Sequence, residues 1–376
     1  MSKNKVCILR SNPVNPDSRV EKEAYTLIKA GYDVRIYSWD RTSNHCPLQE
    51  MIKVGNTSIP ITRVGYKATY GEGLKNIKQY LSFQYAMRRY LRREKFDIVH
   101  ACDFDTSFFT YKLVKRIGGK FIFDIFDFLC DNRKTFIQKI LVTAQYKIIN
   151  EADATIICTE ERRTQIRGSV PRRICVVHNT PSAEQLVKPV DSITSKRMVR
   201  VCYVGILQNG RLLKEIGDFF AEHPEIEFHI GGFGYLESYF NELSSKCSNI
   251  KFYGKISYEK TLELEQSSDI MLAIYDPAIP NHKMAAPNKL YEGLLLGKPL
   301  IMAKGTGMSF VVEENSIGEM IDYSKEGFSN GLNKLIARKA EWHSIGIKMQ
   351  QIYIKDYNWE EMAKRLCNLY EELMEQ

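Results

Sequence analysis

One pattern constrains the fold of this chain more than any other: short apolar runs alternate with amphipathic segments, and the alternation occurs twice. The runs fall at 5–9, 34–37, 97–101, 120–125, 154–159 and 173–178, and again at 199–204, 226–230, 249–253, 269–274, 299–303 and 319–321. Strand, helix and strand within so few residues indicate parallel βαβ units. Because residues 182–196 interrupt the pattern, we predict an α/β protein with two successive doubly wound, Rossmann-like domains.

The length of the chain supports the same division, because 376 residues exceed what one core of typical size holds. We place an N-terminal domain at 1–185, a linker at 186–198 and a C-terminal domain at 199–355. The last segment, 356–376, contains an amphipathic helix that starts at Trp359 and carries Met362, Leu366, Tyr370 and Leu373 on its apolar stripe.

The composition argues against several classes of function. The net charge of +8 comes without an Arg-rich arm, zinc-finger spacing or an aromatic RNA-binding signature, so no nucleic-acid partner is expected. The nine cysteines are scattered and form no Cys-x-x-Cys pair, which argues against a metal or redox site and fits a reducing cytosol. The sequence shows no signal peptide and no apolar run of membrane-spanning length. We therefore expect a cytoplasmic protein, soluble or peripheral at the inner face of the plasma membrane.

The stretch at 287–303 carries the most specific chemical signal. Pro287 can open a helix in its first turn, Gly297 can end it in a left-handed cap, and residues 299–303 are typical of a buried strand. Lys289 and Glu292 then share one face beside the positive end of the helix. A cation, a carboxylate and a helix N-terminus suit a nucleoside diphosphate and its ribose. The alternative is an ordinary surface ion pair on a packing helix.

In the first half, acidic side chains follow the ends of predicted strands. Asp103, Asp105 and Asp127 come directly after such runs, and ligands bind beyond the carboxyl ends of parallel strands; each carboxylate could instead cap a loop or helix. The loop at 10–17 lacks a Gly-x-Gly-x-x-Gly, which counts against a nicotinamide or flavin cofactor. Residues 44–70 are expected to form a connecting loop with an edge strand around 59–63.

Residues 73–95 combine seven basic side chains with aromatic ones. The basic residues are Lys75, Lys78, Arg88, Arg89, Arg92, Arg93 and Lys95, interleaved with Tyr80, Phe83, Tyr85 and Tyr90. One interpretation is an interfacial helix that docks on an anionic membrane surface. The other is a solvated helix whose aromatic side chains pack on the sheet.

The chain resembles the retaining nucleotide-sugar glycosyltransferases of the GT-B fold (family 4, group 1). The stretches that carry the resemblance are 203–205 with Arg211, 231–234, 250–257, and 287–292 closed by 297–299, together with 17–24, 30–34 and 96–100 in the first half. The resemblance covers nearly the whole chain. It implies two Rossmann-like domains that face a cleft, with the acceptor side on the first domain and the last helix packed back onto that domain.

The resemblance also implies roles for single residues. Glu292 would bind the donor ribose, Arg211 would hold the diphosphate with Lys214 as the alternative, and Lys289 lies close enough in sequence to join the phosphate site. The catalytic candidates are Arg211, Lys289, Asp127 and His100. The donor-binding candidates are Gly205, Arg211, Lys214, Gly232, Gly234, Ile256, Pro287, Asn288, Lys289, Leu290 and Glu292, and the candidates on the acceptor side are Asp17, Arg19 and Asp103.

The resemblance implies no metal or cofactor, and the nucleotide-diphosphate sugar is a co-substrate. It also makes a protein nucleophile unnecessary, because the departing phosphate can itself take the acceptor proton. The predicted activity is retaining transfer of a hexose-type sugar to a surface polysaccharide or a lipid-linked glycan. Three positions depart from the family pattern: Met284 stands where an acidic residue is usual, Ile206 where an Arg is usual, and Phe126 where a His is usual. These departures favour one alternative, a non-catalytic nucleotide-sugar-binding subunit. The other alternative is a GT-B nucleotide-sugar 2-epimerase, although such enzymes usually need more acid/base carboxylates and histidines than this chain offers.

Overall fold

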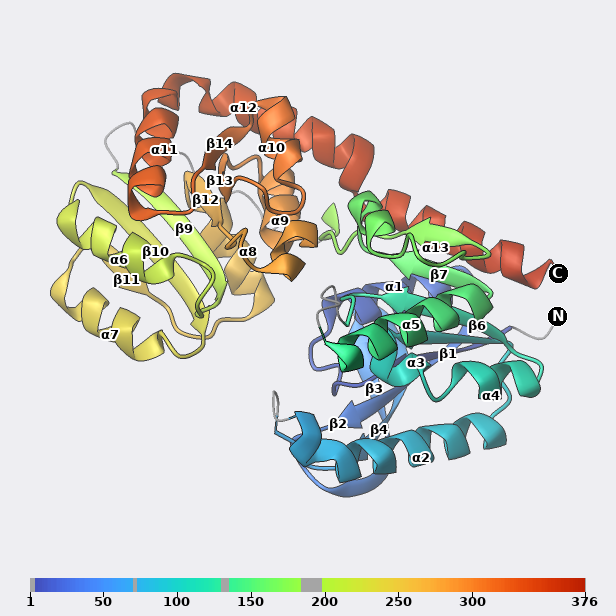
Figure 1. The fold of residues 1–376 in the computed structure, drawn as a ribbon. Coiled ribbons are helices and arrows are strands. Elements are labelled where there is room, and N and C mark those ends of the chain that lie inside the picture. Colours follow the sequence, from blue (N-terminus) through green and yellow to red (C-terminus); the bar gives the residue numbers. More distant parts are fainter. Residues whose placement is uncertain (1–3, 70–72, 130–134, 184–197, 376) are drawn as a thin grey trace. The chain divides into compact units, whose positions relative to one another are not determined.

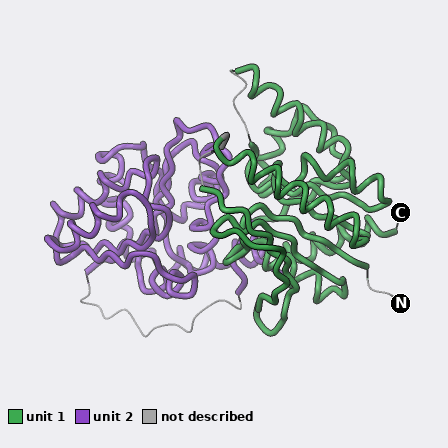
Figure 2. The backbone as a smooth tube through the Cα atoms, turned by 90° about the horizontal axis from the view of Figure 1, so that it is seen from below, with its two compact units in different colours: residues 1–178, 362–376 green, residues 179–361 purple. Residues whose placement is uncertain are grey.

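The computed structural model describes residues 4–69, 73–129, 135–183 and 198–375. The chain forms two compact units, coloured separately in Figure 2. Unit 1 comprises residues 1–178 and 362–376, and unit 2 comprises residues 179–361. The chain thus leaves unit 1 after His178 and returns to it at Met362, whereas the predicted linker, apart from Met198, lies outside the described residues.

Unit 1 is built on an eight-stranded sheet in the order β3-β4-β2-β1-β5-β6-β7-β8 (Figure 1). Its strands are β1 (Lys5–Arg10), β2 (Asp33–Asp40), β3 (His45–Val54), β4 (Thr57–Gly65), β5 (Ile98–Cys102), β6 (Lys120–Ile125), β7 (Ala154–Ile157) and β8 (Ile174–Val176). Its helices are α1 (Ser18–Lys29), α2 (Ile77–Arg93), α3 (Asp103–Ser107), α4 (Tyr111–Arg116), α5 (Phe136–Glu151) and α13 (Trp359–Met374), with short 3-10 turns η1 (Gly73–Asn76) and η2 (Glu160–Thr164).

Unit 2 is built on a six-stranded parallel sheet in the order β11-β10-β9-β12-β13-β14. Its strands are β9 (Val199–Ile206), β10 (Ile226–Phe233), β11 (Ile250–Phe252), β12 (Ile270–Ala273), β13 (Leu300–Ala303) and β14 (Gly318–Ile321). Its helices are α6 (Leu213–Glu222), α7 (Glu237–Lys246), α8 (Tyr258–Gln266), α9 (Asn288–Leu296), α10 (Ser309–Asn315), α11 (Lys325–Ala337) and α12 (Trp342–Ile352), with the 3-10 turns η4 (Pro280–Met284) and η5 (Lys339–Glu341) and a π-helical turn, η6 (Tyr353–Tyr357).

The predicted alternation of strands and helices in both halves is confirmed. Each sheet is covered on both faces, as parallel sheets require. In unit 1 the side chains of α2, α4 and α5 share one core with one face of the sheet, and α1 and α13 bond to residues of the other face. In unit 2 one core gathers α6, α7 and α11, and the other gathers α8, α9, α10 and α12.

The expectation of a connecting loop at 44–70 is wrong. β3 and β4 form an antiparallel hairpin there, and β4 also pairs in parallel with β2, so the strand around 59–63 is internal and β3 is the edge. Most side chains of β3 are exposed. With neither face buried, β3 shows no apolar alternation from which a strand could be predicted.

The aromatic side chains of the basic segment are divided between the two faces of α2. Phe83 stacks on Trp39 at 5.1 Å and Tyr90 stacks on Tyr37 at 4.5 Å, so these rings belong to the core of unit 1. Tyr85, in contrast, is 68% exposed. The packing interpretation therefore holds for the inner face of α2 but does not explain the exposed aromatic side chain on its outer face.

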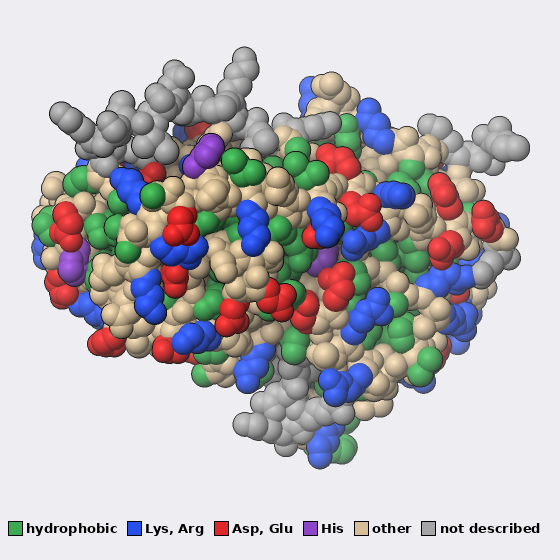
Figure 3. All heavy atoms as spheres, turned by 90° about the horizontal axis from the view of Figure 1, so that it is seen from above, with side chains coloured by type: hydrophobic (Ala, Val, Ile, Leu, Met, Phe, Trp, Pro, Cys, Tyr) green, Lys and Arg blue, Asp and Glu red, His purple; other side chains and the backbone are tan. Residues whose placement is uncertain are grey.

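The surface carries charges of both signs. On the face shown in Figure 3, Lys and Arg side chains are interspersed with Asp and Glu side chains and do not gather into one basic area. Among the described helices, none is long and apolar enough to cross a membrane.

Candidate active site

The predicted donor-binding glycines of unit 2 lie at the carboxyl ends of two paired strands. β9 and β10 run in parallel register, which places Gly232 beside Gly205. Gly232 has φ +140°, and a Cβ there would stand 1.8 Å from the carbonyl oxygen of Gly205, a contact that only glycine avoids. A Cβ on Gly205 would stand 2.7 Å from Nζ of Lys289. The ammonium group therefore occupies the space that the missing side chain leaves.

Lys289 connects the first turn of α9 to the end of β9. Its Nζ lies 4.7 Å from the centre of the Tyr203 ring, within the range of a cation–π interaction. Burial lowers the pKa of Lys289, but its neighbours Tyr203 and Tyr275 outweigh this effect and raise the pKa above its usual value. The side chain is thus a fixed cation at the carboxyl edge of the sheet.

Arg211 approaches the same tyrosine from the loop that follows β9. Burial raises the pKa of Tyr203 and the positive charge of Arg211 acts to lower it, and the Tyr203 hydroxyl donates to the carbonyl of Ile206 at 3.0 Å. The Arg211 Cζ lies 3.7 Å from the centre of the Tyr275 ring. Two cations from separate elements, Arg211 and Lys289, are therefore placed around one tyrosine.

This arrangement suits an anion that carries more than one negative charge. A guanidinium presents several N–H donors in a plane and a lysine presents a compact charge, and both are common partners of phosphate oxygens. Cations held in place before binding can stabilise charge that develops on a leaving phosphate without further reorganisation.

Glu292 lies one turn further along α9 and is only 4% exposed. Tyr258 of α8 lies near it: burial, and after it the charge of Glu292, raise the pKa of that tyrosine. A second carboxyl group, Glu265, is 1% exposed; burial and then Glu292 raise its pKa well above the usual value. The Lys289 and Glu292 pair is therefore part of a buried cluster, and the surface-pair alternative is wrong.

The other predicted donor-binding residues are divided between surface and core. Lys214 is exposed in the first turn of α6, and Asn288 is exposed, with its amide oxygen accepting from Asn179 at 3.1 Å. Leu290 is fully buried in the core, and its N–H donates to the carbonyl of Pro287, so its placement does not support donor contact. Pro287 precedes the helix as its N-cap and does not stand in its first turn.

Gly234 and Ile256 support the backbone around these residues. A Cβ on Gly234, at φ +142°, would stand 2.5 Å from the carbonyl oxygen of Leu207. Ile256 Cδ1 lies 3.1 Å from where a Cβ of Gly231 would stand. At the far end of α9, Gly297 adopts φ +65°, which confirms the left-handed cap predicted there.

Sequence reasoning missed two residues beside Arg211. Tyr275 follows β12, and His282 lies in η4 with Nε2 2.9 Å from Arg211 Nη1. Tyr275 could have been found, because it occupies the same position after a parallel strand as the acidic residues singled out in unit 1. His282 had no such signal, since it stands 71 residues from Arg211.

The catalytic role expected for His100 is not supported by its position. His100 is the third residue of β5 and is completely buried. One ring nitrogen is 2.8 Å from the Tyr370 hydroxyl of α13 and the other is 3.1 Å from Asp124. The acceptor-side role of Arg19 fails for the same reason: Arg19 is 2% exposed, and its Nη2 is 2.8 Å from Asp124. These residues join α1 and α13 to the sheet.

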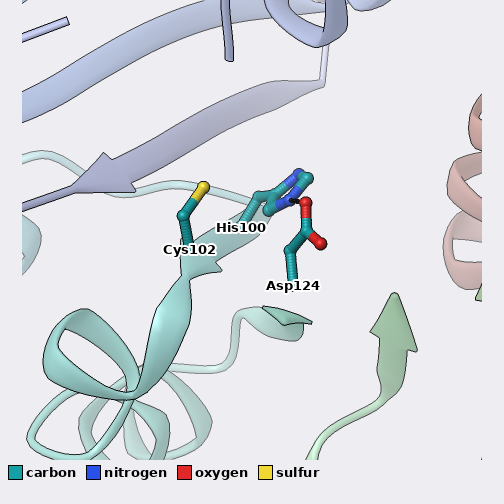
Figure 4. A group of neighbouring side chains, drawn as sticks. All are labelled: His100, Cys102 and Asp124. Carbon is teal, nitrogen blue, oxygen red and sulfur yellow. Dashed lines mark hydrogen bonds and ion pairs between the residues drawn. The ribbon is translucent and has the colours of Figure 1, made fainter. Parts of the chain in front are cut away.

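His100, Cys102 and Asp124 offer possible ligand atoms within 4.8 Å of one another (Figure 4). The group does not fit a metal ion, because a guanidinium already binds Asp124 and both His100 nitrogens have partners. Burial also raises the pKa of Cys102 well above its usual value, so the thiol stays protonated. A metal would require the deprotonated thiol and a free carboxylate.

Two of the remaining candidates in unit 1 lie at the carboxyl edge of the sheet. Asp103 follows β5 with φ +67°, which is uncommon for a residue with a side chain. Its carboxylate binds Arg10 and accepts backbone N–H groups of Phe126 and Asp127 at 2.9 and 3.1 Å. Burial raises the pKa of Asp103 to about 6. Asp17 caps α1 and binds Arg10 at 2.8 Å.

Phe126 follows β6 and stands where the family usually has a His. The ring of Phe126 lies between the guanidinium groups of Arg10 and Arg19, with their Cζ atoms 4.3 and 4.5 Å from its centre. Asp127 points outward, with 70% of its side chain exposed, and pairs with Arg162 at 3.2 Å. Of the two catalytic candidates in unit 1, only Asp127 is accessible.

Two protein-family models match the chain: one described as a glycosyl transferase 4-like domain over residues 16–180, and one described as glycosyl transferase-like over residues 211–368. An uncharacterised glycosyltransferase of Methanocaldococcus jannaschii is 22% identical over 188 residues. That match covers 48% of this chain and 46% of the relative, so the chain spans less than half of the length of this relative.

Solved structures share the fold over nearly the whole chain. A sucrose-phosphate synthase from Thermosynechococcus elongatus is similar with a TM-score of 0.78 at 15% identity, over 99% of both chains. HepE of Anabaena, solved in complex with UDP, is similar with a TM-score of 0.70 at 12% identity, over 98% of this chain and all of that one. With two glycosyltransferase domains and this two-domain fold, the chain belongs to the group 1 glycosyltransferases of the GT-B fold.

Proposed function

We propose that this transferase moves a hexose-type sugar, with retention of configuration, from a nucleoside-diphosphate donor to a surface-polysaccharide or lipid-linked glycan acceptor. The observation that carries the proposal is the placement of Arg211 and Lys289 around Tyr203. As the bond between sugar and phosphate breaks, negative charge grows on the leaving diphosphate, and these two cations would stabilise it.

The donor would bind with its diphosphate at the carboxyl ends of β9 and β10, where Gly232 lets the two strands approach closely and Gly205 leaves room for the Lys289 ammonium group. Glu292 would take the ribose hydroxyls from its place on α9. Because Met284 and Ile206 replace residues usual in the family, contacts to the sugar itself would come from other side chains.

The test is a thermal-shift panel with UDP, GDP, dTDP and CDP, followed by donor hydrolysis without acceptor. A ligand at one hundred times its Kd should stabilise the folded protein by about 2.7 kcal/mol. UDP is the first choice because HepE was solved with it. If none of the four nucleotides stabilises the protein, or if Arg211→Ala binds as well as the wild type, the donor site is wrongly assigned.

The outer face of α2 favours a peripheral membrane location for this reaction. Ile77, Leu81 and Tyr85 stand one turn apart on this face and are 49%, 50% and 68% exposed. Basic side chains on the same segment are exposed too: Lys75, Lys78, Arg89, Arg92, Arg93 and Lys95. An apolar stripe beside basic residues fits a surface rich in anionic lipid, where a lipid-linked acceptor would be found.

A further inference from the structure

Three partners surround the guanidinium of Arg211. The ring of Tyr275 stacks on it, Nε2 of His282 lies 2.9 Å from Nη1, and its charge acts on the nearby side chain of Tyr203. Nη1 also donates to the carbonyl of Gly210 at 3.1 Å. One edge of the guanidinium is thus used by the protein, and its direction is set by these contacts.

The contact with His282 determines the state of the imidazole. A guanidinium can only donate, so Nε2 must accept and carry no proton. The proton is then on Nδ1, which donates to the carbonyl oxygen of Asp276 at 3.0 Å. Burial, followed by the charge of Arg211, lowers the pKa of His282, in agreement with a neutral ring.

The ring has little freedom to leave this position. The Tyr275 ring meets it edge-on, with 5.2 Å between ring centres. The backbone of His282 is held as well, because its N–H donates to Ile279 and its carbonyl accepts from Gly307. The charged groups facing the ring are Arg211, from the loop after β9, and Asp276, from the loop after β12.

We infer that His282 is a positioning residue for the donor diphosphate, acting through Arg211. A carboxylate at this place would orient the guanidinium but neutralise it. A neutral imidazole orients it and leaves the full charge for the phosphate oxygens. This inference rests on the proposed function. It gives a role in donor binding to η4, the turn in which Met284 stands where the family usually has an acidic residue.

Nucleotide binding should depend on the protonation of His282. Protonation of Nε2 would remove the acceptor and place a second positive charge against Arg211. Affinity for a nucleoside diphosphate should therefore fall as the pH drops into the range where His282 gains a proton, beyond any change in the nucleotide itself.

The experiment measures the Kd of UDP, GDP, dTDP and CDP by calorimetry between pH 5 and pH 8 for four proteins: wild type, His282→Gln, His282→Leu and the control His343→Gln. For the nucleotide that binds best, His282→Leu should weaken binding about tenfold, in the range of one hydrogen bond to a charged group. In His282→Gln the amide oxygen can still accept from Arg211, so its Kd at pH 8 should stay within about threefold of the wild-type value. Its affinity should not fall at acidic pH, because the amide does not gain a proton there. His343→Gln should keep the wild-type profile.

A double-mutant cycle separates positioning from general damage. In an Arg211→Ala background, His282→Leu should cause no further loss of affinity. An equal loss in both backgrounds, or wild-type affinity for His282→Leu, would overturn the inference. If His282→Leu does not fold, the pH dependence of nucleotide affinity in His282→Gln decides. If that affinity falls at acidic pH as it does in the wild type, the inference is rejected. Failure of the wild type to bind any of the four nucleotides would count against the proposed function instead.

Discussion

The ammonium group of Lys289 lies over the ring of Tyr203, 4.7 Å from its centre, and so joins the first turn of α9 to the carboxyl end of β9. Burial raises the pKa of the same tyrosine, and the charge of Arg211 acts to lower it. Because the ring is 2% exposed and packed in the core of unit 2, it is a rigid support for both cations. We expect both cations, and the buried groups around them, to contribute to donor binding and turnover.

Lys289 and Glu292 should contribute to different kinetic constants. Lys289 would act on charge that grows as the bond breaks, so Lys289→Ala should lower kcat about 10- to 100-fold with a modest change in donor affinity. Glu292 would act on ribose hydroxyls that do not change, so Glu292→Ala should mainly raise the donor KM. Steady-state kinetics of folded variants measure both constants.

Lys304→Ala is the control, since this exposed lysine only pairs with Asp322. Full kcat/KM in both test variants would show that α9 only packs against its neighbours. If Lys289→Ala mainly raised the donor KM and Glu292→Ala mainly lowered kcat, the site assignment would stand but the roles of the two residues would be exchanged.

Gly232 should be far less tolerant of a side chain than Gly254. A Cβ at Gly232 would meet the Gly205 carbonyl oxygen, so Gly232→Ala should displace the end of β9 and abolish nucleotide binding. Gly254→Ala, at φ +62° with nothing within 4 Å, should cost only about 1–2 kcal/mol of backbone strain. Thermal unfolding and UDP titration compare the two. Equal nucleotide affinity in both variants would contradict the close approach of β9 and β10.

Glu23 should make the stability of unit 1 sensitive to pH. It is fully buried, and burial followed by Asp124 raises its pKa to about 7. The folded state then binds a proton that the unfolded state has released, so this contribution to stability is present below pH 4.5 and is lost as the pH rises through 7.

Glu23→Gln should therefore gain stability relative to the wild type as the pH rises from 5 to 8, by on the order of 1–3 kcal/mol. Urea unfolding at several pH values measures this difference, with the exposed Glu242→Gln as the matched control. Parallel curves for wild type and Glu23→Gln would show that Glu23 does not change its protonation in this range.

The outer face of α2 should direct the protein to anionic membranes. Flotation with vesicles that contain anionic lipid should recover the wild type at low salt and less of it at high salt, since each basic side chain near the surface contributes about 1 kcal/mol that salt screens. Leu81→Gln with Tyr85→Gln should reduce recovery, and Ile354→Gln, an exposed apolar position in unit 2, should not. Equal recovery on neutral and anionic vesicles would leave α2 as a solvated helix.

The last helix should be needed for the stability of unit 1. Met362, Leu366 and Tyr370 are fully buried, and Tyr370 contacts His100 through its hydroxyl. Truncation before Asp356 should expose apolar surface on unit 1 and lower its melting temperature. Tyr370→Phe, which removes only the hydroxyl, should cost about 1 kcal/mol. A truncated chain with an unchanged melting temperature would show that α13 is dispensable.

The elements of the fold that could be predicted are those whose signal is local. The βαβ alternation and the glycine cap of α9 depend on which residues near in sequence are buried, and apolar periodicity reports that directly. β3 escaped prediction because neither of its faces is buried. The glycines and Arg211 were assigned to the proposed donor site from their resemblance to a family, whereas Lys289 was assigned to it because the helix spacing placed it beside Glu292.

By itself, then, the sequence determined two doubly wound halves, their glycine turns and the residue types of the proposed phosphate site. Only the tertiary structure decided which of them meet. β12 pairs next to β9 in the sheet, and this neighbourhood carries Tyr275 and His282 to Arg211 across 71 residues of chain. The tertiary structure of unit 1 also buries His100 and Arg19, which the resemblance had placed among the site candidates. The physical reason is that periodicity reports whether a side chain is inside, whereas strand order decides which distant side chain it touches there.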